Sequence, residues 1–200
     1  MKKLRVYLGD LSYFNEFAYS MITAPLNIGY VASYTKKVHE NECEIILFKN
    51  PDKLLKASKT KPPDVLGLSN YFWNMRLDIG MSEIIKKMNP DCTIVVGGPS
   101  ICTDMVELSK LNSLYKGMAD FFVENEGELG FANVISALLS RGRGKLFNDP
   151  IDGCTFFTEA KEPVSGENIG LSLDLSTVPS PILSGLLDEF LNEKYMPIIS

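Results

Sequence analysis

Histidine, cysteine and long apolar runs are scarce in this sequence, and each scarcity excludes a class of protein. The 200 residues include one histidine and four cysteines, which stand far apart at Cys43, Cys92, Cys102 and Cys154. No two cysteines have the spacing of a metal site, so we expect reduced and mostly buried thiols. No apolar run approaches the roughly 20 residues that span a bilayer, and the N-terminus has the pattern of a strand and not of a signal peptide. We therefore expect no membrane association and a cytoplasmic location.

The charge and the supply of nucleophiles exclude two further classes. A net charge of -5, with acids and bases interleaved, provides no basic surface for nucleic acid. The single histidine, His39, ends a predicted helix between charged residues, so we expect it to be exposed to solvent. No serine or cysteine elbow accompanies it, and nucleophilic catalysis has no support. The chain is otherwise typical of a globular protein, with 45% hydrophobic and 22% charged residues.

Five short apolar runs alternate with helical patterns through residues 1–142. The predicted strands cover residues 4–8, 42–48, 65–69, 93–96 and 120–123. This alternation predicts an α/β fold with a doubly wound, five-stranded parallel sheet. The flavodoxin-like order 2-1-3-4-5 fits better than a dinucleotide-binding order, because no Gly-x-Gly-x-x-Gly follows the first strand and a sixth strand is missing.

The remaining residues predict a small extension of this domain. Two short β patterns within residues 143–170 favour a hairpin at the edge of the sheet. Residues 171–200 contain two prolines before residue 182, Pro179 and Pro181, and one at Pro197, and they are typical of a linker. A strand-like pattern starts at Pro197 and the sequence ends at Ser200, so we expect this chain to be a fragment of a longer protein.

Polar and glycine-rich loops follow the predicted strands at the edge where open α/β sheets bind ligands. Gly97 and Gly98 would let a flat ligand approach the backbone, although a tight turn would need the same residues. Ser69 and Asn70 can donate hydrogen bonds to a phosphate or a ring nitrogen, or they can cap a helix. The four loops of this rim cover residues 9–24, 69–74, 97–100 and 124–128.

Two further groups at this rim have a structural and a functional interpretation. Tyr71, Phe72 and Trp73 exceed what a turn requires, and we expect one or two of them to face a flat ligand or a partner domain. Glu126 and Glu128 open the last helix, where carboxylates usually complement the helix dipole. An acid–base pair is the lesser alternative for these two glutamates.

Together these segments resemble the N-terminal cobalamin-binding domain of cobalamin-dependent radical S-adenosylmethionine (SAM) enzymes. The likeness rests on PLNIGY at residues 25–30, DVLGLS at 64–69, VVGGP at 95–99 and EGE at 126–128. Residues 71–74 and the proline-rich stretch 174–187 add to it, so the likeness covers nearly the whole chain. The resemblance implies that a corrin lies against the rim, with its nucleotide tail inserted beside the sheet.

The resemblance also implies which residues hold the tail. Ser69 and Asn70 would bind the tail or its phosphate, and residues 97–99 (Gly97, Gly98 and Pro99) would pack against the dimethylbenzimidazole base. Glu126 and Gly127 would line the tail from the last loop.

The corrin itself would be approached by Tyr71, Trp73 and Asn74, and Leu26 and Asn27 belong to the same implied binding set. Such domains often lack the histidine that ligates cobalt in other cobalamin proteins. This sequence agrees, because no Asp-x-His-x-x-Gly follows its first strand. The resemblance thus implies cobalamin without a protein imidazole on cobalt.

Two departures from the family pattern matter. The family usually has Gly-Glu-Gly-Glu in the last loop, and in this sequence Asn125 stands in place of the first glycine. Asn125 and Glu128, the first and last residues of this stretch, both belong to the implied binding set. We expect Asn125 to cap the last helix and to tolerate a left-handed backbone. The Cys-x-x-x-Cys-x-x-Cys cluster is absent, so SAM and a 4Fe-4S cluster would belong to a following radical SAM domain. This chain alone would then lack a catalytic centre, and the full protein would perform methyl transfer or related radical chemistry.

Two alternatives stay open at this point. The domain could have kept the fold as a structural or interaction module and lost cobalamin. A flavin or nucleotide binder of flavodoxin type is weaker, because it needs a phosphate loop rich in glycine and hydroxyl groups after the first strand, and residues 9–24 contain one glycine and several aromatic residues. The sequence does not indicate an oligomeric state.

Overall fold

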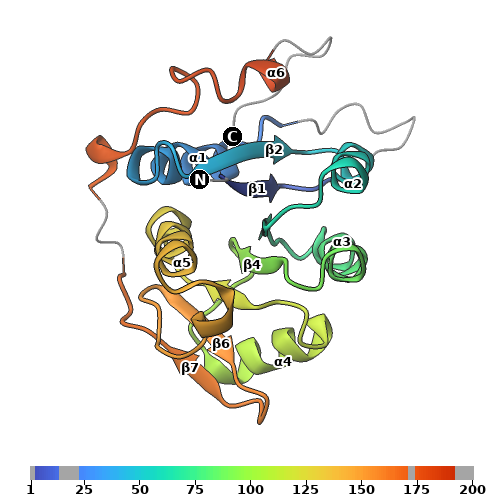
Figure 1. The fold of residues 1–200 in the computed structure, drawn as a ribbon, viewed down its shortest axis with the longest axis vertical. Helices are drawn as coiled ribbons and strands as arrows, with labels where there is room; N and C mark the ends of the chain where they lie inside the picture. The colour runs from blue at the N-terminus through green and yellow to red at the C-terminus, as the bar shows by residue number, and fades with distance from the viewer. Residues whose placement is uncertain (1–2, 14–22, 171–173, 192–200) are drawn as a thin grey trace.

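A seven-stranded sheet forms the centre of the computed structural model, which describes residues 3–13, 23–170 and 174–191 (Figure 1). The strand order is β2-β1-β3-β4-β5-β6-β7, with parallel pairing from β2 to β5 and antiparallel pairing from β5 to β7. The predicted order 2-1-3-4-5 and the edge hairpin are therefore confirmed. The strands are β1 (Leu4–Gly9), β2 (Cys43–Phe48), β3 (Val65–Ser69), β4 (Thr93–Gly97), β5 (Phe121–Val123), β6 (Cys154–Phe157) and β7 (Pro163–Ser165).

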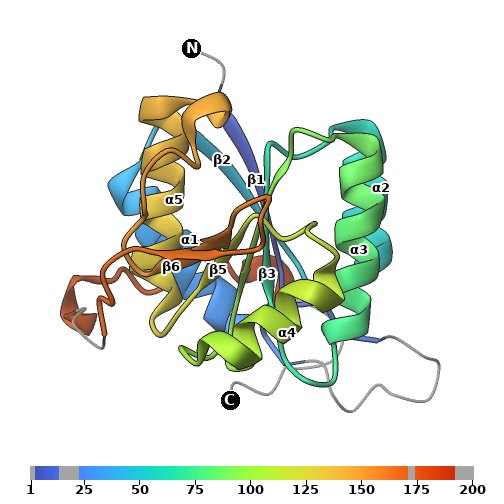
Figure 2. The ribbon, with the colours of Figure 1, turned by 90° about the horizontal axis from the view of Figure 1, so that it is seen from below.

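Helices cover both faces of the sheet (Figure 2). On one face lie α1 (Leu26–Val38) and α5 (Gly127–Arg141), which pack against each other. On the other face lie α2 (Pro51–Thr60), α3 (Met75–Met88) and α4 (Met105–Tyr115). Shorter helical turns are η2 (Arg143–Lys145), η3 (Leu175–Thr177) and α6 (Asp188–Leu191). Within the described ranges, no helix is both long and apolar enough to cross a membrane.

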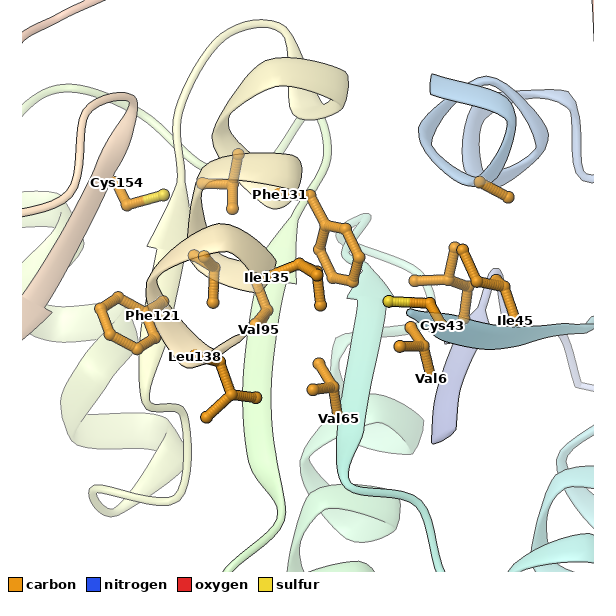
Figure 3. Close-up of a cluster of buried hydrophobic side chains, with 14 of the residues drawn as sticks. Val6, Cys43, Ile45, Val65, Val95, Phe121, Phe131, Ile135, Leu138 and Cys154 are labelled. Atoms are coloured by element: carbon orange, nitrogen blue, oxygen red, sulfur yellow. The ribbon is translucent and has the colours of Figure 1, made fainter. Parts of the chain in front are cut away.

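Successive residues of each central strand point to opposite faces, so the strands supply two separate cores. Val65 and Val95 belong to the core under α1 and α5, and Phe131 of α5 projects toward them (Figure 3). Leu66 and Ile94 belong to the core under α2, α3 and α4. These two cores explain the continuous apolar character of the central strands.

The starts of α2 and α5 differ in how they are capped. The Asn50 side chain caps α2, because its Oδ1 accepts hydrogen bonds from the backbone N of Asp52 (2.8 Å) and Lys53 (3.2 Å). The prediction that Asn125 caps α5 was wrong, because the helix starts after Glu126. Asn125 instead adopts the expected left-handed backbone (φ +54°). Its side-chain Nδ2 donates a hydrogen bond to Asn168 Oδ1 at 2.9 Å.

His39 is buried, so the prediction of solvent exposure was wrong. It retains 8% exposure, and its Nε2 lies 2.9 Å from the hydroxyl of Ser136 on α5. Its Nδ1 lies 3.1 Å from Glu42 Oε2. The end of α1 packs under α5, and this helix crossing cannot be read from the charged neighbours of His39 in the sequence.

The segment of residues 174–191, predicted as linker, packs along α1 (Figure 1). Lys37 Nζ donates to the backbone O of Thr177 at 2.6 Å, and Ser33 Oγ donates to the backbone O of Pro179 at 2.6 Å. Leu187 is completely buried. These contacts make residues 174–191 part of the packed domain. The predicted strand at residues 197–200 lies outside the described residues, as does most of the loop predicted at residues 9–24.

Candidate cofactor site

A cavity of about 340 Å³ lies between the sheet and the helices α1 and α5, toward the carboxyl ends of β3, β4 and β5. The first turns of α1 and α5 lie at this carboxyl edge of the sheet and line the cavity. Open α/β sheets bind ligands at this edge. Eight residues predicted from the sequence line the cavity: Asn27, Ser69, Gly97, Gly98, Pro99, Asn125, Gly127 and Glu128.

The glycine pair has two distinct roles at the mouth of the cavity. Gly98 has φ +103°, and a Cβ there would lie 2.8 Å from both the N and the O of Asn70, so the position requires glycine. A Cβ at Gly97 would meet the Cβ of Val123 at 3.6 Å, an ordinary contact. Gly97 therefore tolerates a side chain sterically, and its bare backbone leaves the adjacent space open to a ligand.

The deep end of the cavity rests on a third glycine, Gly67 in the middle of β3. A Cβ there would lie 2.5 Å from Leu8 Cδ2 and 2.9 Å from Phe131 Cε2. Leu8 and Phe131 both line the cavity and are 2% and 4% exposed. The ring of Phe131 thus packs against bare backbone, and the apolar floor takes its shape from the absence of a side chain at Gly67.

A polar group links α1, β3 and the aromatic loop at the mouth. Asn27 Nδ2 donates to Ser69 Oγ at 2.7 Å and to the Tyr71 hydroxyl at 3.0 Å, which uses both amide hydrogens. In the part of the chain that the structure describes, the Ser69 hydroxyl hydrogen has no acceptor. Ser69 can therefore donate a hydrogen bond to a ligand in the cavity.

The structure does not bring Asn70 or Asn74 into the cavity. Both side chains are completely buried below the rim. Asn70 Nδ2 donates to Asp78 Oδ2 at 3.2 Å and to the Tyr115 hydroxyl at 3.0 Å. Asn74 Nδ2 donates to the backbone O of Ser69 at 2.9 Å, which holds the end of β3. Both asparagines thus shape the loop after β3, and the sequence alone could not show that their side chains turn inward.

The aromatic residues lie beside the cavity and do not line it. Tyr71 and Trp73 stack with ring centroids 4.4 Å apart and planes at 16°, and Phe72 meets Trp73 edge-on at 4.7 Å. Phe72 is 81% exposed and Trp73 is 54% exposed. Phe72 and Trp73 therefore do not roof the core, and they form an exposed apolar surface next to the mouth, beside the half-buried Tyr71. Leu26, which is half-buried, also lies outside the cavity lining.

Glu128 is the titratable side chain that lines the mouth. Burial raises the pKa of its carboxyl group, and the neighbouring charge of Glu126 raises it further, against a hydrogen bond from its own backbone. Glu126 does not line the cavity. Among the described residues, no group of three or more histidine, cysteine or acidic side chains could hold a metal ion.

Sequence reasoning missed the apolar lining of the site. Leu8, Val95, Val123 and Phe131 line the cavity but look like ordinary core residues in the sequence. The available signal was Gly67, because a glycine inside an apolar strand often marks a close approach of another group.

The fold and the cavity define a class of protein, an open α/β domain with a preformed cofactor pocket at the carboxyl edge of its sheet. Comparison with known proteins specifies this class. The family described as "B12 binding domain" matches residues 18–135. The chain belongs to this family, and the predicted likeness to a cobalamin-binding domain is confirmed.

Two curated relatives are similar to this chain. One is the "Cobalamin-dependent radical SAM methyltransferase TokK" of Streptomyces tokunonensis, 27% identical over 126 residues, which are 63% of this chain and 17% of the relative. The other is the "2-(S-pantetheinyl)-carbapenam-3-carboxylate methyltransferase" of Streptantibioticus cattleyicolor, 27% identical over 132 residues, which are 66% of this chain and 18% of the relative. The chain thus matches less than a fifth of the length of these relatives.

A solved structure with a similar arrangement is "a novel cobalamin-binding protein" from Desulfitobacterium hafniense DCB-2. It has a TM-score of 0.46 and 14% sequence identity, and the match covers 68% of this chain and 58% of that one.

Proposed function

We propose that this chain binds cobalamin with the nucleotide tail inside the cavity and the corrin across the rim. The observation that carries this proposal is the open cavity beside Gly97 and Gly98 in a member of the B12-binding family. Its volume of about 340 Å³ is at the lower end of small-molecule sites. Such a space suits a bicyclic base with part of its sugar and excludes a corrin ring, which must stay outside.

The residues present fit this division of the cofactor. The Ser69 hydroxyl would donate to the phosphate or to a ring nitrogen of the tail, with Asn27 fixing its orientation. Residues 97–99 would pack against the base, and Asn125, Gly127 and Glu128 would line it from the last loop, next to Glu126. When bound, cobalamin supplies a cobalt centre that can carry a methyl group.

The exposed ring of Trp73 and the half-buried ring of Tyr71 would contact the corrin beside the mouth, next to Leu26 at the start of α1. Asn70 and Asn74 support this surface from below by holding the loop after β3. Their contribution to binding is therefore indirect.

Cobalt would receive no imidazole from this chain. His39 is the single histidine of the sequence and caps the C-terminal end of α1, whereas Asn27 and Ile28 at the N-terminal end of α1 line the cavity. About 12 residues of helix at 1.5 Å per residue separate the two ends. The buried contact of His39 with Ser136 also holds it in place.

We further infer that the cobalamin serves a radical SAM domain of the same protein. The support is the similarity to two methyltransferases of which this chain spans less than a fifth. SAM and a 4Fe-4S cluster would be held by that other domain, and methyl transfer is the inferred reaction. In the proposed division, residues 1–142 form the cobalamin domain, 143–170 its edge extension and 171–200 the passage to the radical SAM domain.

The decisive test replaces Gly97 by leucine and measures binding of hydroxocobalamin. The Cβ of a leucine fits at position 97 without a clash, and the rest of its side chain would occupy the cavity. Gly80→Leu on α3 is the matched control, because nothing lies within 4 Å of a Cβ there. Binding is followed by co-elution of the corrin in gel filtration and by titration of the visible absorbance.

We expect the unmodified chain and Gly80→Leu to bind one cobalamin each. Gly97→Leu should bind at least about tenfold more weakly at an unchanged unfolding temperature, because the base loses its space. Unmodified protein that elutes free of corrin would instead support the purely structural module. Equal binding by Gly97→Leu would place the tail elsewhere.

A further inference from the structure

The cavity changes in polarity from its mouth to its floor. The polar side chains that line it, Asn27, Ser69, Asn125 and Glu128, belong to strand ends, loops or first helix turns at the mouth. Gly67 and Val95 lie further down in the middle of β3 and β4, and Phe131 lies in the second turn of α5. The inner end of any inserted group would therefore meet an apolar surface.

This floor offers a ligand no hydrogen-bonding partner from its side chains. Val95 and Phe131 are 1% and 4% exposed and belong to the core under α1 and α5. The floor backbone is also engaged in the sheet, because Gly67 pairs with Leu8 on one side and with Val95 on the other. A polar atom buried against this floor would lose its water without replacement.

We propose that the cavity selects among cobalamin-type cofactors by the base of the nucleotide tail, favouring dimethylbenzimidazole over adenine. This inference rests on the proposed function. Adenine carries an exocyclic amine and ring nitrogens on the edge that enters first, and the floor leaves them unpaired. Dimethylbenzimidazole carries two methyl groups at that edge, and each buried methyl is worth about fourfold in affinity.

The specificity-determining residues of this selection are Val95 and Phe131. Phe131 closes the floor over Gly67, where a Cβ would come within 2.9 Å of its ring. Figure 3 shows Phe131 projecting from α5 toward the sheet, with Val95 on the same face. Together they set both the depth and the apolar character of the slot.

The experiment compares three cofactors on the 200-residue chain: hydroxocobalamin, its adenine-tailed analogue pseudocobalamin, and cobinamide, which has no nucleotide. Dissociation constants are measured by absorbance titration. We expect cobalamin to bind at least about tenfold more tightly than pseudocobalamin, and cobinamide to bind more weakly than cobalamin. Affinities for cobalamin and pseudocobalamin within threefold of each other would overturn the selection and leave cobalamin binding intact. Failure of all three to bind would overturn the proposed function and the selection together.

A pair of matched variants tests whether the floor causes the preference. Val95→Thr keeps the shape of the side chain and adds a hydroxyl to the floor, so the ratio of the two affinities should shrink at least threefold. Val65→Thr makes the same change on the same face of the sheet, at a residue that is completely buried and does not line the cavity. In Val65→Thr the ratio of the affinities for cobalamin and pseudocobalamin should equal that of the unmodified chain. An unchanged ratio in Val95→Thr, or an equal change in Val65→Thr, would overturn the assignment of the floor.

Discussion

Replacing Asp78 by asparagine should stabilise this domain at neutral and alkaline pH. Asp78 is completely buried on α3, and its Oδ2 accepts a hydrogen bond from Asn70. Its Oδ1 and the Oδ1 of Asn70 are both buried without a hydrogen-bond partner in the described structure. An amide at position 78 keeps one oxygen as the acceptor for Asn70 and replaces the unpartnered oxygen of Asp78 by an NH2 group, which can donate a hydrogen bond. A buried group without a partner costs about 1–3 kcal/mol, so Asp78→Asn should gain about that much at pH 8.

The gain should depend on pH in a defined direction. Burial raises the pKa of Asp78 well above its ordinary value of 3.8; the hydrogen bond from Asn70 opposes this shift, and the nearby charge of Asp10 adds to it. The folded protein therefore binds this proton more tightly than the unfolded chain does. The contribution of Asp78 to the stability of the folded protein is fully present below about pH 4, and it is lost as the pH rises through the folded pKa of Asp78. The asparagine variant lacks this loss, so the difference between the two proteins opens as the pH increases.

Urea or thermal unfolding of both proteins at pH 4.5 and pH 8 measures this difference. A gain of 1 kcal/mol corresponds to roughly 2–4 °C in the unfolding temperature for a chain of this size. The control is Asp91→Asn, an exposed aspartate, which should change neither value. A variant that is less stable than the original at pH 8, or a gain of equal size at both pH values, would refute the reasoning.

Three further outcomes follow from burial and pairing in the structure. Leu187→Ala should cost about 2–5 kcal/mol, because Leu187 is completely buried against α1, and an unchanged urea midpoint would show that residues 174–191 do not pack there in solution. Asp120→Asn should cost about 3 kcal/mol, because its carboxylate pairs with both Lys86 and Arg143, and a loss below 0.5 kcal/mol would contradict the value of that pairing. Cys102 should be the first cysteine to react with maleimide in the native protein, because it is exposed, whereas burial raises the pKa of Cys92 to about 12. Mass mapping of the labelled peptides measures the order of reaction, and a buried cysteine that reacts before Cys102 would contradict the prediction.

The structural basis of the site lies in contacts between distant parts of the sequence. Gly67 and Phe131 stand 64 positions apart, yet the Phe131 ring occupies the space that a Gly67 side chain would need. Asn27 and Ser69 meet at the mouth because β1 and β3 are neighbours in the sheet. Neither contact leaves a periodic signal, so only the assembled sheet reveals them.

Eight of the fourteen predicted binding residues line the cavity, and two of the other six lie outside it for the same reason. A residue that follows a parallel strand lies at the carboxyl edge of the sheet, and by this rule Ser69, Gly97 and Gly98 were expected where the cavity is found. The rule does not say where a side chain points. Asn70 and Asn74 follow the same strand and turn inward to satisfy buried partners. His39 likewise turned out to be buried, because two helices cross above it.

The sequence by itself determined the local elements and their order, because apolar periodicity and the glycines and prolines between segments act over a few residues. It also determined that one edge of the sheet would carry glycines and polar groups. Only the tertiary structure decided which of those groups face the cavity, which serve as buried supports, and which apolar residues, such as Phe131, form its floor. These outcomes depend on packing between α1, α5 and the sheet, and packing is a property of segments that are far apart in the chain.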